Sequence, residues 1–267
     1  MDREKTRTLA SNLLATYFTD ITRVIEINDA SLIFDHFASS EISAYSGFTD
    51  DQRPIIFFDQ NLDHWLFSIY QAFAIRAFFI VTDEVRKETN GILTMILRSL
   101  KQPDLHLGIR ERLRAYMAKY PKALPVINCL TMTSNAFIIC HEIAHYQLEH
   151  DGNINDHNQE YQADQTGYEY LLALSKAPDA TQHLKITPNF LCSPCLLMRC
   201  LDLAEQFFAR EAGVEIKDSQ SHPRAEKRRL ALQDANLKNW NLEAQNLYDG
   251  FNATIDELAS DLGLSVR

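Results

Sequence analysis

Two histidines four residues apart, with a glutamate directly after the first, lie in the segment CHEIAHYQLEH at residues 140–150. Side chains four apart on a helix project from one face with Cβ atoms about 5–6 Å apart, so His141 and His145 can bind one metal ion. Glu142 lies about 100° round the helix from His141, where it can contact a water molecule bound to that ion. The segment therefore predicts two metal ligands and a general base, although His-Glu-x-x-His also occurs by chance on exposed helices.

A third ligand is needed, because a catalytic zinc ion usually has three protein ligands and one open position. Metzincin-type proteases take it from a histidine six residues beyond the second, after a glycine that lets the chain turn. Those two positions hold Asp151 and Leu148 here, which excludes that geometry. The helix is therefore expected to continue to about Gly152, and the third ligand to come from another element.

Glu160, fifteen residues after His145, is the best candidate for this third ligand. Asp164 follows four residues later, on the same face of a predicted helix. A metal-bound imidazole needs an acceptor for its other N–H group, so Asp164 is expected to orient His141 while Glu160 binds the zinc ion.

Two sequence blocks resemble known zinc peptidases. HEIAH followed by EYQAD resembles the gluzincin arrangement, in which a second helix supplies Glu-x-x-x-Asp. SHPRAEKRRLAL, at residues 221–232, is similar to the His-Pro-x-x-x-x-Arg block of the HtpX and CAAX-prenyl-protease type of gluzincin, and matches it at His222, Pro223 and Arg228. The resemblance spans residues 141–228 and implies a Zn²⁺-dependent metallopeptidase. HtpX-type enzymes carry clear membrane-spanning helices, which this chain does not show, so a soluble offshoot is expected.

A weaker resemblance lies upstream, where PIIFFDQNLDHWLFSIYQAF at residues 54–73 is loosely similar to the phage-exclusion peptidase Lit, a cytosolic, gluzincin-like protease of bacteria. The alternative to a general protease is a regulatory, phage-defence or toxin–antitoxin component that keeps the metallopeptidase fold with narrow or no proteolytic activity. The retained Glu142 argues against an inactive enzyme, because a purely structural zinc ion has no use for a general base.

The reaction expected from these residues is hydrolysis of peptide bonds in an intracellular protein. Zinc lowers the pKa of its bound water towards ~7, and Glu142 accepts the proton as the water attacks and then returns it to the leaving nitrogen. The carbonyl oxygen acquires charge and needs a hydrogen-bond donor. His222, Arg228 and Tyr168 are alternatives for that donor.

Other ligand-type side chains near these motifs have structural interpretations. His150 is expected to point about 140° away from His145 and to cap the end of its helix, where a cationic side chain is favoured. His157 is a possible substitute ligand should Glu160 fail. Cys195 and Cys200 are expected to face the core, because no matching Cys/His pair follows CSPC to complete a structural zinc site.

The apolar pattern predicts a predominantly helical α+β fold with a helical N-terminal half and a small sheet. The resemblance implies that this fold is a gluzincin-like zinc peptidase. One compact unit is expected over residues 1–267, with a helical N-terminal part at 1–120 and a zinc-binding catalytic part at 121–267. Strands are expected at 54–58 and 123–130, and TMTSN at 131–135 is expected to cap the helix that carries His-Glu-x-x-His. The other helices are expected at residues 3–28, 62–82, 108–119, 157–176, 192–213 (with Ser193 as cap, Pro194 in the first turn and Gly213 at the end) and from 221 onward.

The net charge and the cysteine content indicate which partners and which cellular compartment to expect. With 26 Lys+Arg against 36 Asp+Glu, the formal charge of −10 argues against a nucleic-acid partner and leaves a polypeptide substrate. The five cysteines do not form a secreted disulfide framework, and MDREKTRTLA has no apolar signal region, so a cytoplasmic location is expected. The apolar run at 64–82 approaches the ~20 residues of a membrane span, but Arg76 interrupts it and favours a buried core helix over membrane association.

Overall fold

The computed structural model describes residues 3–37, 43–78, 82–102, 106–119, 121–150, 156–177, 179, 181–219 and 222–265. Helices dominate and a small three-stranded sheet lies in the N-terminal half, which confirms the predicted fold class. In chain order the elements are α1 (Arg3–Val24), β1 (Ile33–Phe37), β2 (Ala44–Phe48), β3 (Pro54–Asp59), α2 (Gln60–Phe78), α3 (Asp83–Ser99), α4 (His106–Met117), η2 (Pro121–Ala123), α5 (Leu124–Gln147), α6 (His157–Lys176), η3 (Pro188–Phe190), α7 (Ser193–Ala212), α8 (Ala225–Asn236), η4 (Leu237–Asn239) and α9 (Leu242–Asp261).

The sheet has the strand order β1-β3-β2. The central strand β3 runs parallel to β1, with Ile55 opposite Ile33, and antiparallel to β2, with Phe58 opposite Ala44. The consecutive residues 56–58 are all buried, so both faces of β3 are covered. A strand covered on both faces is typically a continuous apolar run, and the strand predicted at PIIFF is confirmed.

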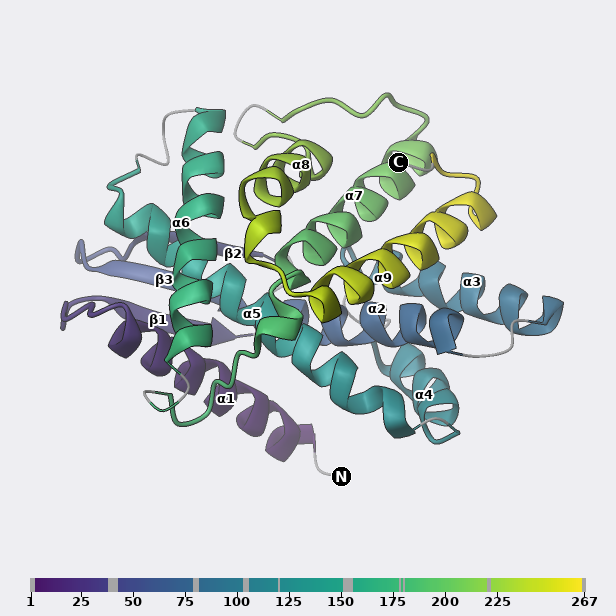
Figure 1. Cartoon of the computed structure of the whole chain (residues 1–267), viewed down its shortest axis with the longest axis horizontal. Helices are drawn as coiled ribbons and strands as arrows, with labels where there is room; N and C mark the ends of the chain where they lie inside the picture. Colours follow the sequence, from purple (N-terminus) through teal and green to yellow (C-terminus); the bar gives the residue numbers. More distant parts are fainter. Residues whose placement is uncertain are drawn as a thin grey trace.

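Helix α5 runs through the middle of the molecule, with the sheet and α1 on one side and α7 to α9 on the other (Figure 1). It packs against α6 more extensively than against any other element, and also contacts α2, α7, β2 and β3. Because α5 is covered along most of its length, its apolar residues occupy all of its faces rather than one stripe.

The strand predicted at residues 123–130 is wrong, because Ala123 ends η2 and residues 124–130 form the first two turns of α5. Pro125 lies in the first turn, where proline is tolerated because its missing N–H has no partner there. A short, mostly apolar run does not by itself distinguish a buried strand from a helix segment, and among residues 124–130 only Ile127 and Leu130 are buried. Thr131 and Asn135, expected to cap the helix, are instead buried within it. The end predicted near Gly152 lies outside the described residues, and α5 ends earlier, at Gln147.

The apolar segment lies in α2 as far as Phe78, and the inner residues of α2 are buried, which confirms the predicted core helix over that range. Residues 79–81 lie outside the described residues, and Thr82 caps α3. The Arg76 side chain is buried and pairs with Glu257 and Asp261 of α9 at 2.7 and 2.8 Å. In the part of the chain that the structure describes, one helical stretch is long and apolar enough to cross a membrane, Pro121–Gln147, and 67% of its most apolar window is buried inside the protein.

The helices predicted at 108–119, 157–176 and 192–213 are confirmed as α4, α6 and α7. The helix predicted at 3–28 is α1, which ends at Val24, and the one predicted from 221 onward is α8, which begins only at Ala225. Gly213 follows α7 with φ 65°, a left-handed conformation that glycine adopts without a steric penalty, as expected for a helix end. Pro194 lies in the first turn, but Ser193, expected to cap α7, is its first residue, and Cys192 holds the cap position.

Candidate metal centre

The crossing of α5 and α6 brings together three side chains that the sequence places on two different helices. His141 and His145 point from α5 and Glu160 from α6, and one ligand atom of each lies within 4.8 Å of the others. The two Nε2 atoms are 3.1 Å apart. The carboxylate oxygens of Glu160 lie 3.6 Å from Nε2 of His141 and 3.5 Å from Nε2 of His145. The first of these two distances is to Oε2 and the second to Oε1, so each imidazole nitrogen faces one oxygen of the same carboxylate.

These pairwise distances of 3.1, 3.5 and 3.6 Å are close to the ligand spacing of a tetrahedral zinc ion. With zinc–ligand bonds of 2.0–2.2 Å, two ligand atoms of a tetrahedron are separated by about 3.3–3.5 Å. Two imidazole nitrogens and one carboxylate oxygen are also the donor set of a catalytic zinc site that keeps one position open. The residues present therefore fit a zinc ion.

The outer nitrogen of His141 is held on the buried side of the site. Its Nδ1 lies 3.0 Å from Oδ1 of Asp164, which is 2% exposed. The guanidinium of Arg228 donates to both oxygens of Asp164, at 2.8 and 2.7 Å, and its Nη1 lies 3.0 Å from Oε2 of Glu160. One arginine from α8 thus holds both carboxylates from α6 in place.

The charged and hydrogen-bonding neighbours of Glu160 and Asp164 lower the pKa values of both carboxyl groups. Burial would raise the pKa of Glu160, but the hydrogen bond from His145 and the charge of Arg228 lower it to about 2. Burial would likewise raise the pKa of Asp164, which Arg228 and His141 instead hold below its usual range. Both groups are therefore ionised at neutral pH, as a zinc ligand and its supporting acceptor must be.

Gly167 marks the place where α6 crosses α5 at the level of the site. A Cβ atom on this residue would lie 2.9 Å from the backbone N and 3.0 Å from Cα of His141. Backbone atoms cannot move aside as a flexible side chain can, so only glycine permits this approach. Sequence reasoning missed Gly167, although an isolated glycine inside a helical pattern is the signal for such a close packing contact.

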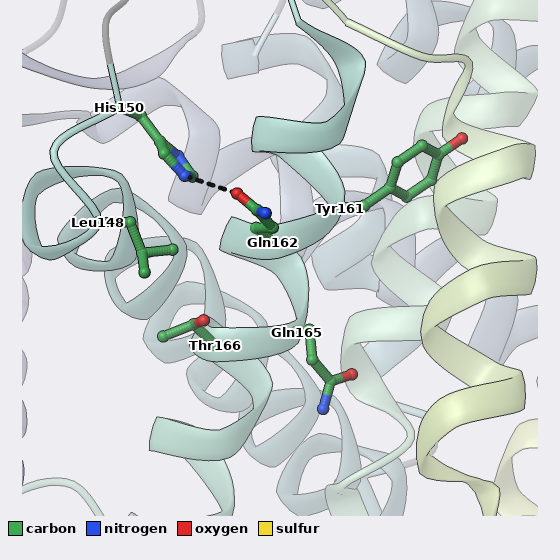
Figure 2. A pocket seen from close by; sticks show the side chains of 6 residues that line it. All are labelled: Leu148, His150, Tyr161, Gln162, Gln165 and Thr166. Carbon is green, nitrogen blue, oxygen red and sulfur yellow. Dashed lines mark hydrogen bonds between the residues drawn. The ribbon is translucent and has the colours of Figure 1, made fainter.

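The outer nitrogen of His145 is held by a residue for which the sequence predicted a different position. Nδ1 of His150 lies 2.9 Å from Nδ1 of His145, and Nε2 of His150 lies 3.1 Å from Oε1 of Gln162 on α6 (Figure 2). The prediction that His150 points away from His145 is wrong because it extended the helix past its end. The chain leaves the helix after Gln147 and turns back at Glu149, which has φ 52°.

Glu142 lies next to His141 on α5 and is 7% exposed. No side chain within the described ranges forms a hydrogen bond or an ion pair with its carboxylate. A carboxylate in this position, beside two candidate metal ligands, is suited to receive a proton from a water molecule.

The three candidate donors for the oxyanion lie in different surroundings. The Tyr168 side chain is fully buried and its hydroxyl accepts a hydrogen bond from Nε1 of Trp240 at 3.0 Å, so it does not reach the site. The Arg228 guanidinium is occupied by the two carboxylates. The His222 side chain is 58% exposed, with Nε2 3.4 Å from Oε1 of Glu160 on the open side. His157, the substitute ligand, instead lies 3.0 Å from the backbone oxygen of Ser219.

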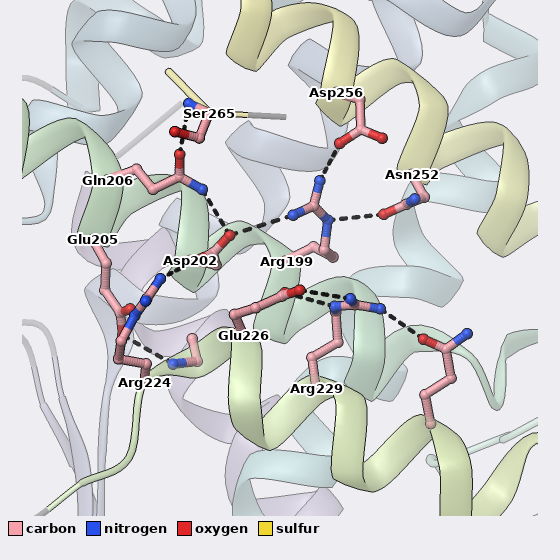
Figure 3. Close-up of polar contacts among 12 residues, drawn as sticks. Arg199, Asp202, Glu205, Gln206, Arg224, Glu226, Arg229, Asn252, Asp256 and Ser265 are labelled. Atoms are coloured by element: carbon pink, nitrogen blue, oxygen red, sulfur yellow. Dashed lines mark hydrogen bonds and ion pairs between the residues drawn. The ribbon is translucent and has the colours of Figure 1, made fainter. Parts of the chain in front are cut away.

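The start of α8, which carries Arg228, is tied to α7 by a second polar cluster (Figure 3). Arg199 of α7 is buried and reaches Asp202 at 3.3 Å, and it also pairs with Asp256 of α9. Arg224 lies 3.6 Å from Asp202, and the first backbone N–H of α8 donates to Glu205 at 3.2 Å. These contacts set the position from which Arg228 reaches the site.

Comparison with known proteins gave one match. A family model described as peptidase U49 matches residues 96–251, more than half of the chain and the whole of the candidate site. This family is Lit-like, in agreement with the weaker of the two resemblances, whereas the match does not support the HtpX and CAAX-prenyl-protease type. No curated protein and no solved structure matches the chain.

Proposed function

The chain belongs to the peptidase U49 family, and on this premise we propose that it is a zinc-dependent metalloendopeptidase acting on an intracellular protein. The observation that carries the proposal is the convergence of His141, His145 and Glu160 from two helices. A free carboxylate, that of Glu142, stands beside them on the same helix turn. The five cysteines are all free, which suits a reducing compartment such as the cytoplasm.

In this mechanism His141, His145 and Glu160 hold the zinc ion. When bound, the ion supplies Lewis-acid activation of a water molecule and of the scissile carbonyl. Glu142 takes the proton of the attacking water and returns it to the leaving nitrogen as the peptide bond breaks. His222 donates to the developing oxyanion, since it is exposed beside Glu160 while Arg228 holds the carboxylates and Tyr168 bonds to Trp240.

The first test separates the general base from the ligands. Glu142→Gln keeps the size of the side chain and removes its ability to accept a proton, so zinc content should match the wild type while hydrolysis falls at least ~10²-fold. His141→Ala and Glu160→Ala should instead lose zinc, because two protein ligands rarely hold it tightly. Glu111→Gln, an exposed glutamate on α4, is the matched control and should change neither quantity.

The substrate is sought by comparing cells that express the wild type with cells that express Glu142→Gln. New protein N-termini that appear only with the wild type identify the substrate and its cleavage site, whether specificity is broad or narrow. A wild-type protein without bound zinc, or a Glu142→Gln protein that produces the same new N-termini, contradicts the proposed function.

A further inference from the structure

If the chain binds zinc as proposed above, the ring of its second histidine ligand, His145, must also be held in place. A metal-bound imidazole is oriented by the acceptor of its other N–H group, and the loss of such a partner typically weakens metal binding. Asp164 serves His141 in this way. Among the described residues, no carboxylate lies in contact with Nδ1 of His145, and the ring nitrogen that does is Nδ1 of His150 at 2.9 Å.

The protons on this chain of contacts have one consistent arrangement when Nε2 of His145 binds zinc. Nδ1 of His145 then carries a hydrogen and donates, so Nδ1 of His150 must accept. The hydrogen of a neutral His150 must consequently lie on Nε2, which faces Oε1 of Gln162, an acceptor, at 3.1 Å. Each atom in the sequence His145, His150, Gln162 therefore has the donor or acceptor role that its neighbour requires.

The backbone that places His150 is a helix-ending turn closed by two hydrogen bonds. The N–H of His150 donates to the oxygen of His145 at 3.1 Å, and the N–H of Glu149 donates to the oxygen of Tyr146 at 3.2 Å. This is the Schellman pattern, whose left-handed position is usually glycine. Here that position is Glu149, at a steric cost of about 1–2 kcal/mol. The turn returns the chain so that the His150 ring lies against the His145 ring, with centroids 5.0 Å apart.

We propose that His150 is a positioning residue that accepts the hydrogen bond of the second zinc ligand, His145, and that Gln162 sets its tautomer. His150 and Gln162 thus form an uncharged pair that supports His145, as the charged pair of Asp164 and Arg228 supports His141. His150 acts through His145 and does not itself bind the metal, because its imidazole is not among the three groups whose ligand atoms converge.

Both residues of this pair line an open hollow of about 460 Å³ on the outer face of α6, together with Leu148, Tyr161, Gln165 and Thr166 (Figure 2). The outer edge of the His150 ring is therefore reachable from solvent. A vacancy left by truncating His150 would open into the hollow, and free imidazole could enter it.

The test measures zinc affinity by competition with a chelator and records the absorption spectrum of the cobalt-substituted protein. His150→Ala should bind zinc about 10–100-fold more weakly and alter the cobalt spectrum, while the unfolding midpoint of the metal-free protein stays that of the wild type. His150→Asn, whose amide oxygen can take the place of the accepting Nδ1, should recover most of the affinity. His183→Ala, which removes an exposed histidine outside the site, should change nothing.

Free imidazole provides the second arm. It should restore part of the zinc affinity of His150→Ala and none to His183→Ala, which also corrects for zinc bound by imidazole in solution. Wild-type affinity in His150→Ala, a loss that neither asparagine nor imidazole reduces, or a lowered unfolding midpoint of the metal-free variant overturns the inference. A wild-type protein that binds no zinc overturns the proposed function instead.

Discussion

The two histidines of the candidate metal site have opposite kinds of surroundings. The His141 ring contacts the buried carboxylate of Asp164, and Arg228 of α8 neutralises the charge of that carboxylate. The His145 ring contacts the imidazole of His150, which lies just past the end of the same helix and beside an open hollow. A buried charge is stable only with its partner in place, whereas a neutral acceptor needs no counter-ion. The first side therefore couples the metal site to the packing of α5, α6 and α8, and the second depends on one turn.

This difference predicts that changes on the His141 side reduce both folding stability and metal binding, while changes on the His145 side reduce metal binding alone.

Arg228→Ala should lower the free energy of unfolding by about 3–5 kcal/mol, because it leaves the carboxylates of Asp164 and Glu160 buried without their cation. Gln162→Leu on the other side should change it by no more than about 0.5 kcal/mol. Denaturant titration of the metal-free proteins measures both. Arg228→Lys keeps the charge but loses the two-pronged contact, so its stability should fall between that of the wild type and that of Arg228→Ala. Equal losses in Arg228→Ala and Gln162→Leu would refute the division.

The stability contribution of Glu160 should depend on pH in a defined window. Its folded-state pKa is about 2, against an ordinary value of 4.5. Stability from a depressed pKa is fully present above the unfolded-state value and is lost as the pH falls through the folded-state value. The metal-free wild type should exceed Glu160→Gln by up to about 3 kcal/mol above pH ~5, and the gap should close towards pH ~2. A gap that does not change with pH would show that Glu160 is not held as an ion.

Gly167→Ala should lower the free energy of unfolding by about 1–3 kcal/mol and weaken zinc binding, because the added methyl group forces α6 away from the His141 backbone. Gly91→Ala is the matched control. Gly91 lies in α3, and an added Cβ would meet no atom within 4 Å, so this change should stabilise the protein by about 0.5–1 kcal/mol. The same sign for both substitutions would contradict the close contact.

Glu149→Gly should raise the free energy of unfolding by about 1 kcal/mol or less, because glycine adopts φ 52° without the penalty of a side chain. Zinc affinity should stay at the wild-type value, since the turn that places His150 is kept. Thermal unfolding of the metal-free protein and chelator competition measure the two quantities. A fall in zinc affinity would mean that the glutamate side chain itself contributes to the site.

Several features that the structure displays have no unambiguous signal in the sequence. Residues 124–130 form the start of α5 with Ile127 and Leu130 buried, and such a short, mostly apolar run fits a buried strand equally well. Helical geometry predicts the wrong direction for His150, because the helix ends before this residue. The left-handed residue of that helix end is Glu149, and a glutamate, unlike a glycine, does not signal a helix end. Tyr168 is one of ten tyrosines, and only the position of Trp240 removes it from the site.

The spacing along the chain by itself determined which side chains share a helix face: His141 with His145, and Glu160 with Asp164. That relation is local, since 3.6 residues per turn place positions four apart on one side of any helix. The crossing of those two faces was decided by tertiary structure, which brings Gly167 against the backbone of His141 and Arg228 between the two carboxylates. Such contacts depend on the packing of whole helices, and no local pattern records which residues two packed helices will bring together.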